Sequence, residues 1–236
     1  MDSLFSRITL LDVHEKLIRN IVSIRSSQDL FDDLTSDPDA WALAQQIEEE
    51  VKPPPYQSGT PVIHRPFEDA DWFNAIAWPF KHWQSSRFSD GSFGVWYGCD
   101  CVETSVHETA YHWVSGFLSD AGFHTENVIG ERKVYTVDCY AALLDFRPLI
   151  SRYPGLVHKT DYSYPQSVGA RLNREGHPGL TTTSVRHETG QNYAVLNANV
   201  LSNPCPHCQL TYRLEGSRIF VERQQGINWM EITTDF

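Results

Sequence analysis

Three side chains in one short stretch of the chain have the chemistry needed to act on a dinucleotide. Arg87 lies on a glycine-rich turn, Tyr97 ends a short apolar run, and Glu108 follows at the start of an amphipathic segment. A guanidinium holds phosphate oxygens, an aromatic ring stacks on a base or sugar, and a carboxylate stabilises a sugar cation. The combination indicates chemistry at the C1′ carbon of NAD, although the glycines of this stretch do not form a Rossmann fingerprint.

Glu108 has two interpretations that the sequence leaves open. Ser105-Val106-His107-Glu108 matches the S-x-x-E capping box, in which the glutamate reaches back to the N-cap amide of a helix. The alternative is a carboxylate at the base of a cleft, where it stabilises an oxocarbenium-like centre. The two exclude each other in part, because a carboxylate committed to capping is less available to a substrate.

Three further polar residues lie outside that stretch. Arg65, in VIHRPF, is either a surface arginine before a proline or a guanidinium directed at a pyrophosphate. Ser184 and Asn192 lie in β-like runs on either side of HETGQ. In isolation they are ordinary strand residues, but a hairpin would bring them to the same end of a sheet.

Two histidine and cysteine patterns resemble metal ligands, and neither supplies a complete metal site. His107 and His112 lie five positions apart, which on a helix rotates one ring from the other by roughly 140°, so the zincin pattern fails. Cys205-Pro-His-Cys208 is a C-x-x-C motif without a second matching pair. We favour a plain turn for it over a metal site or a redox dithiol, and we expect no bound metal.

The composition indicates a folded, acidic protein. The 236 residues are 41% hydrophobic, which is enough for a core, and the net charge is −11. That charge argues against duplex nucleic acid and anionic membranes as partners. No apolar run is long enough to span a membrane, the N-terminus does not have the pattern of a secretory signal, and the five cysteines do not read as a disulfide framework. We therefore expect a cytoplasmic protein.

The sequence pattern of the chain changes near residue 55. Apolar residues recur at helical spacing from Leu10 to Ile24, and Asp37-Pro38 is typical of the start of a second helix. Residues 1–55 are therefore predicted to form a helical segment that ends in a proline-rich linker. This acidic segment is a candidate for oligomerisation or for docking a partner. Residues 56–236 are predicted to form the catalytic domain.

The second part of the chain has the pattern of an α+β fold, because its β-like runs do not alternate regularly with helices. Helices are expected at about 105–118 and 164–175, with Gly176 as the C-terminal glycine of the second. The β-like runs are Pro61–His64, Gly94–Gly98, Val134–Cys139, Leu180–Arg186, Tyr193–Leu201, Leu210–Leu214 and Arg218–Glu222.

These fragments, in this order, resemble the RES domain family, the toxin half of RES–Xre toxin–antitoxin systems. The match covers roughly residues 60–201. The fragments that carry it are Arg65 near a first strand, Ser86-Arg87-Phe88 through Gly94 and Tyr97, the helix block Ser105–Glu108, and Ser184–Arg186 followed by the run that begins at Asn192.

The resemblance implies a fold related to ADP-ribosyltransferases, with a mixed, largely antiparallel β core and a cleft that binds NAD as substrate. The roles that it implies are phosphate binding by Arg65 and Arg87, stacking by Tyr97, stabilisation of the oxocarbenium by Glu108, and orientation of the substrate by Ser184 and Asn192.

The implied reaction is cleavage of the nicotinamide–ribose N-glycosidic bond by hydrolysis or phosphorolysis. Transfer of ADP-ribose to a protein target is an alternative, and an antitoxin or immunity protein is the implied partner. A hypothesis of a different class is a non-catalytic interaction module. In that hypothesis, residues 1–52 bind a partner, and Cys205 and Cys208 help to hold a metal.

Overall fold

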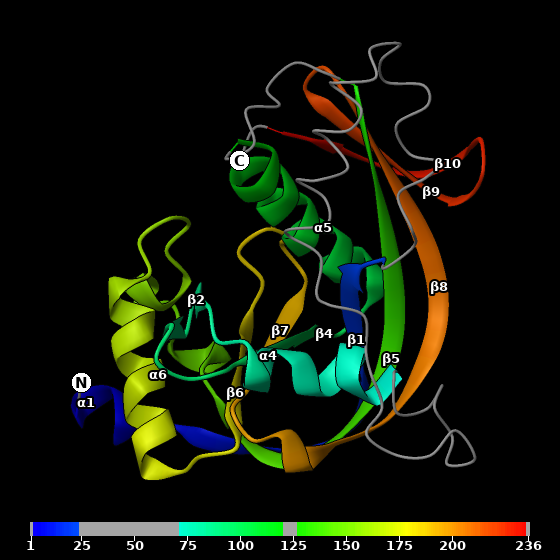
Figure 1. Ribbon diagram of the computed structural model, residues 1–236. Coiled ribbons are helices and arrows are strands. Elements are labelled where there is room, and N and C mark those ends of the chain that lie inside the picture. The colour runs from blue at the N-terminus through cyan, green and yellow to red at the C-terminus, as the bar shows by residue number, and fades with distance from the viewer. Residues whose placement is uncertain (1, 24–70, 120–126, 235–236) are drawn as a thin grey trace, which may run out of the picture.

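The computed structural model describes residues 2–23, 71–119 and 127–234. These residues form a main sheet of eight strands and a separate short hairpin of two. Figure 1 shows how the strands are arranged. The strands of the main sheet are β1 (Thr9–Val22), β4 (Trp96–Cys99), β5 (Val128–Asp145), β6 (Gly179–Thr183), β7 (Gln191–Val195), β8 (Leu201–Glu215), β9 (Arg218–Gln224) and β10 (Ile227–Thr233). The hairpin consists of β2 (Ser85–Ser86) and β3 (Ser89–Asp90).

The main sheet has the order β1-β4-β7-β6-β5-β8-β9-β10, with a further pairing between β1 and β5. That pairing closes β1, β4, β7, β6 and β5 into a ring, while β8, β9 and β10 extend the sheet beyond it. Among the described strands the β5–β6 pair is parallel and the other pairs are antiparallel. The protein is thus α+β with a mixed, largely antiparallel sheet, which confirms the predicted class.

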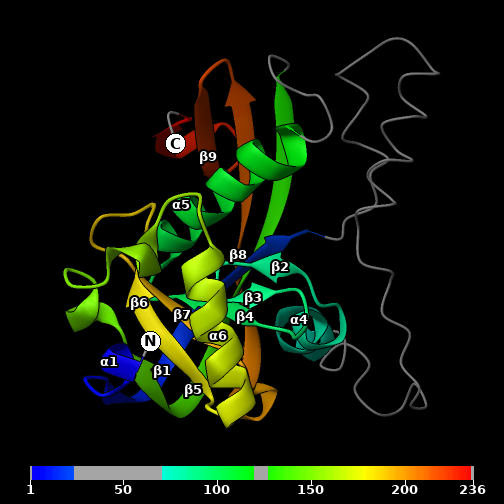
Figure 2. The same ribbon diagram turned by 90° about the vertical axis from the view of Figure 1, so that its left-hand side faces the viewer.

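The helices are short, and two of them shape the site. The helices in the described part of the chain are α1 (Asp2–Phe5), α4 (Trp78–Lys81) after the π-helical turn Phe73–Ala77, α5 (Val102–His112) with its π-helical continuation Trp113–Leu118, and α6 (Ser163–Glu175). The 3₁₀ turns of the same residues lie at Arg147–Leu149, Pro154–Val157 and Ala198–Val200. Helix α5 lies in the hollow of the curved sheet (Figure 1), and α6 packs beside the β2–β3 hairpin (Figure 2). No helix within the described ranges is both long and apolar enough to cross a bilayer.

The predicted N-terminal helix over residues 10–24 is wrong, because Thr9–Val22 form strand β1. The apolar residues of this segment fit both periods. Leu10, Val13, Leu17 and Ile21 are spaced as on a helix, but Val13, Leu17 and Ile21 also share one face of a strand. Fourteen-residue pairing with β5, from Thr9↔Asp145 to Val22↔Arg132, decides in favour of the strand. The proposed second helix at Asp37 and the proline-rich linker lie outside the described residues.

Most of the other predicted elements are confirmed, with two corrections. The run Tyr193–Leu201 is not one strand, since β7 ends at Val195 and a 3₁₀ turn precedes β8. The C-x-x-C motif is not a turn, because Cys205 and Cys208 lie inside β8. Helix α6 ends as predicted at Gly176, which has a left-handed φ of 75°. The predicted run Pro61–His64 lies outside the described residues.

Helix α5 has two faces, and their separation places the site. Val102, Val106, Ala110 and Trp113 are buried in a core cluster shared with β8, β9 and β10. Complete burial of a side chain such as Val106 contributes about 1.5–3 kcal/mol, which fixes the rotation of the helix. The opposite stripe therefore faces the hollow of the sheet, and it carries Ser105, Glu108, Thr109, His112 and Ser115.

Candidate active site

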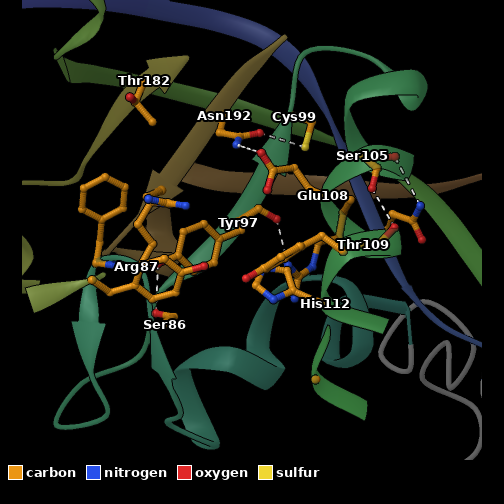
Figure 3. Close-up of a pocket in the computed structure, with 18 of the residues that line it drawn as sticks. Ser86, Arg87, Tyr97, Cys99, Ser105, Glu108, Thr109, His112, Thr182 and Asn192 are labelled. Atoms are coloured by element: carbon orange, nitrogen blue, oxygen red, sulfur yellow. Dashed lines mark hydrogen bonds between the residues drawn. The ribbon is translucent and has the colours of Figure 1, made fainter. Parts of the chain in front are cut away.

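The stripe of α5 forms one wall of a cavity of about 450 Å³. The other walls come from β1, from the β2–β3 hairpin, from β4 and from β7 (Figure 3). Of the residues predicted from the sequence, the cavity brings together Arg87, Tyr97, Glu108 and Asn192. A cavity of this size falls within the range of small-molecule sites.

Glu108 does not cap a helix. Helix α5 begins at Val102, with Cys101 as its N-cap residue, so Glu108 lies in the second turn and Ser105 is internal. The Ser105 hydroxyl donates to the carbonyl of Val102 at 2.7 Å instead of serving an N-terminal amide. The capping-box interpretation is therefore wrong, and the carboxylate points into the cavity (Figure 3).

Two hydrogen bonds hold the Glu108 carboxylate, and both end on Oε1. The Ser184 hydroxyl donates at 2.6 Å and the Asn192 amide at 2.5 Å. Among the described residues no hydrogen bond ends on Oε2. One oxygen is thus fixed by the protein, while the other is left for a ligand.

The predicted hairpin brings Ser184 and Asn192 to the same end of the sheet. Strands β6 and β7 pair with Thr182 opposite Asn192, and Ser184 follows directly after β6. The Ser184 oxygen accepts from the backbone amides of Arg186 and His187, at 3.1 and 2.9 Å, which orients its hydroxyl toward Glu108. Ser184 is buried behind the carboxylate and does not line the cavity, whereas Asn192 does.

Arg87 occupies the turn of the β2–β3 hairpin, which helix α6 holds in place. Gln166 of α6 donates to the carbonyls of Ser86 and Ser89. A Cβ atom at Gly169 would overlap the Phe88 carbonyl, so this close approach requires glycine. The Arg87 guanidinium donates to the His158 carbonyl at 2.6 Å and lies 4.5 Å from the centroid of the Tyr162 ring. Burial lowers its pKa.

Tyr97 presents its ring to the cavity, while its hydroxyl is hydrogen-bonded within the protein. The hydroxyl donates to Ser86 Oγ at 2.9 Å and accepts from the Phe88 amide at 3.0 Å. Burial raises the pKa of this phenol to about 12, so it stays neutral at physiological pH. A contact between Tyr97 and a ligand would therefore be made by the ring face.

Arg65, the other predicted phosphate ligand, lies outside the described residues. Arg19 of β1, which the sequence interpretation missed, lines the cavity. It donates to the Tyr97 carbonyl at 2.8 Å and lies over Trp96, but its Nε is buried without a partner. Burial lowers its pKa to about 10. Within the described residues the Arg19 guanidinium forms no ion pair, so an anion in the cavity would provide its counter-ion.

A second guanidinium lies near Arg19. Arg132 of β5 donates from Nε to Asn20 Oδ1 at 3.0 Å, and burial lowers its pKa. The Asn20 amide in turn donates to the Tyr212 hydroxyl at 3.0 Å, and Asn20 lines the cavity. The partners of both arginines in the described part of the chain are neutral, which makes this end of the cavity electropositive.

The histidines of α5 point in different directions, as their spacing predicted. His107 stacks on His187, with ring centroids 4.9 Å apart, whereas His112 lines the cavity. No group of three or more histidine, cysteine or acidic side chains in the described ranges has a metal-binding arrangement. Cys205 and Cys208 are both free thiols.

A family model matches the part of the chain that contains most of the cavity residues. The family model of the RES domain matches residues 62–215. No curated protein matches the chain in sequence. Among solved structures, a chain of the M. tuberculosis MbcT–MbcA toxin–antitoxin complex aligns with 91% of this chain and 91% of its own, at 13% identity and a TM-score of 0.45.

The family match contains Arg87, Tyr97, Glu108, Ser184 and Asn192, and it leaves β1 with Arg19 outside. It extends over well more than half of the sequence. The chain therefore belongs to the RES domain family.

Proposed function

We propose that the protein cleaves the bond between nicotinamide and ribose in NAD. The observation that carries this proposal is the Glu108 carboxylate, which is held through Oε1 in a cavity that also contains Arg19 and Arg87. The carboxylate suits a sugar cation, and the guanidiniums suit a diphosphate.

The reaction needs little acid catalysis, because the leaving group is already cationic. As the C1′–N bond breaks, its electron pair moves to the pyridinium nitrogen and neutral nicotinamide leaves. Positive charge spreads over C1′ and the ring oxygen of the ribose, where Oε2 of Glu108 stabilises it. Water or phosphate then adds to C1′ and releases a proton. One carboxylate is sufficient for this sequence of events.

The identity of the acceptor distinguishes three outcomes of the same chemistry. Water gives ADP-ribose, phosphate gives ADP-ribose 1″-phosphate, and a side chain of another protein gives an ADP-ribosylated product. We propose hydrolysis or phosphorolysis, because the carboxylate lines a cavity, which water and phosphate enter more easily than a side chain of another protein does. Incubation with NAD, with and without phosphate, followed by mass spectrometry of the small molecules and of added proteins, separates the three.

Membership of the RES family supports a toxin role, in which loss of NAD arrests the cell that contains the enzyme. The enzyme would then encounter NAD in the cytoplasm, and an antitoxin would inhibit the enzyme. Expression of the chain with and without a candidate antitoxin, with NAD measured in cell extracts, tests this role.

Replacement of Glu108 tests the reaction itself. In the Glu108→Gln variant we expect nicotinamide release to fall by about 100-fold, because the neutral amide does not stabilise the sugar cation. Glu103→Gln is the matched control, since Glu103 lies five residues earlier on α5, on a different face, and does not line the cavity. A Glu108→Gln protein that keeps the wild-type melting temperature and the wild-type rate would refute the assignment.

A further inference from the structure

The side-chain amide of Asn192 can donate a hydrogen bond to Glu108 in only one of its two orientations. Its Nδ2 group donates to Glu108 Oε1 at 2.5 Å. If the amide turned over, its Oδ1 would face the carboxylate, and two acceptors would oppose each other. The flipped orientation is therefore unfavourable, and a hydrogen-bond donor at the other end of the amide further stabilises the orientation that donates to Glu108.

The other end is held by Cys99. The thiol of Cys99 lies 3.3 Å from Asn192 Oδ1 and donates to it (Figure 3). The two residues are directly opposite each other in the pairing of β4 with β7. Burial, reinforced by the negative charge of Glu108, raises the pKa of this thiol well above its usual value. The sulfur thus keeps its proton, and a protonated sulfur is a donor.

Packing alone does not account for Cys99. The side chain is 7% exposed, yet it belongs to none of the three apolar core clusters formed by the described residues. Cys139 provides the contrast, because it is completely buried inside a core cluster to which β1, β4, β5 and β7 contribute. Cys99 instead lines the cavity beside the site residues.

We propose that Cys99 is a positioning residue, which holds the Asn192 amide in the orientation that donates to Glu108. This inference rests on the proposed function, since it concerns the carboxylate that stabilises the sugar cation. The thiol donates to Asn192, Asn192 donates to Glu108, and the fixed Oε1 directs Oε2 to the substrate.

A pair of variants that differ by one hydroxyl tests the role. Cys99→Ala removes the donor, and Cys99→Ser restores a donor at the same place. We expect kcat for nicotinamide release to fall about tenfold in Cys99→Ala while KM stays within about threefold, which corresponds to one lost hydrogen bond. We expect Cys99→Ser to recover to within about threefold of wild-type kcat.

The controls are Cys139→Ala and Cys139→Ser, which change a buried cysteine away from the site. We expect both to leave kcat within about threefold of the wild type, whatever they do to the melting temperature. A purely structural role for Cys99 predicts instead that Ala and Ser variants lose activity equally, or that neither does. Either result overturns the proposal.

A second measurement separates this proposal from the proposed function. If the wild type released no nicotinamide, the proposed function would fail, and Cys99 would be judged by the ¹⁵N NMR signals of the Asn192 side-chain amide. We expect these signals to shift in Cys99→Ala and to stay near the wild-type position in Cys99→Ser and in both Cys139 variants. Unchanged signals in Cys99→Ala would exclude the orienting contact.

Discussion

Some polar groups of the site have all their hydrogen-bond and ion-pair partners within the protein, and others do not. The Tyr97 hydroxyl and the Ser184 hydroxyl have all their partners within the protein. Arg19 lines the cavity and forms no ion pair among the described residues. A charged ligand gains most beside such a group, because the protein has partly removed the charge from water without supplying a counter-ion.

Replacement of Arg19 should therefore weaken substrate binding more than folding. In Arg19→Met we expect KM for NAD to rise by at least about tenfold, because a charged hydrogen bond to phosphate is lost. The free energy of unfolding should change by no more than about 1 kcal/mol, since an apolar side chain of similar size replaces a charge without a counter-ion. Steady-state kinetics and urea denaturation measure the two quantities.

Arg174→Met is the control for Arg19→Met, because Arg174 is exposed on α6, away from the cavity. Its KM should equal that of the wild type. An unchanged KM in Arg19→Met would exclude Arg19 from phosphate binding.

At the residue scale, the sequence identifies which residues belong to the site, but it does not predict the role of each one. Glu108, Ser184 and Asn192 are found by motif, but only the fold shows that Ser184 lies behind the carboxylate. The sequence around Arg19 gives no indication of its role. Arg19 lies in a segment of mixed charge whose apolar residues fit a helix, and nothing local indicates that it faces a cavity.

Among the elements, β1 shows why the sequence misleads. A spacing of four residues returns to the same face of both a helix and a strand, so Val13, Leu17 and Ile21 fit either. The decision comes from pairing with β5, which lies more than a hundred residues away, and a local pattern contains no such information. Helix α6 behaves differently, because Gly176 ends it by a local conformational requirement.

The loop after β6 is attached to α5 by a histidine pair. His187 stacks on His107 and hydrogen-bonds through Nδ1 to Thr104 Oγ1 at 2.9 Å. Burial, together with the proximity of His187, lowers the pKa of His107 below its usual 6.5. The folded protein therefore binds this proton less readily than the unfolded chain does, so stability is full above about pH 6.5 and falls as the pH drops from there through the folded pKa.

We accordingly expect the melting temperature to fall when the pH is lowered from about 7.5 to about 5.5. The fall should be smaller in His107→Gln, which has no group to protonate at this position. It should not vanish, because burial also lowers the pKa of His112. Thermal melts followed by circular dichroism across this pH range provide the measurement. Equal pH dependence in the variant and the wild type would contradict the role given to His107.

For the whole molecule, the family match and the folded unit are not the same. The match covers residues 62–215, but the ring of strands closes only through β1, and the cluster under α5 is completed by Ile219, Val221 and Ile232. The acidic N-terminal segment was predicted to be separate from the catalytic domain. Its first part instead pairs with β4 and β5 inside the main sheet.

A fragment of residues 62–215 should therefore fail to fold, although it contains the family motifs. Removal of β1 exposes the long edge of β5 together with the apolar side chains that packed against Val13 and Leu17, and an unpaired, apolar strand edge promotes aggregation. The same cut removes Arg19 from the cavity. We expect the fragment to be insoluble or to lack a cooperative thermal transition, while residues 1–236 melt cooperatively. A soluble, cooperatively melting fragment that still releases nicotinamide would mean that β1 is dispensable to both the sheet and the site.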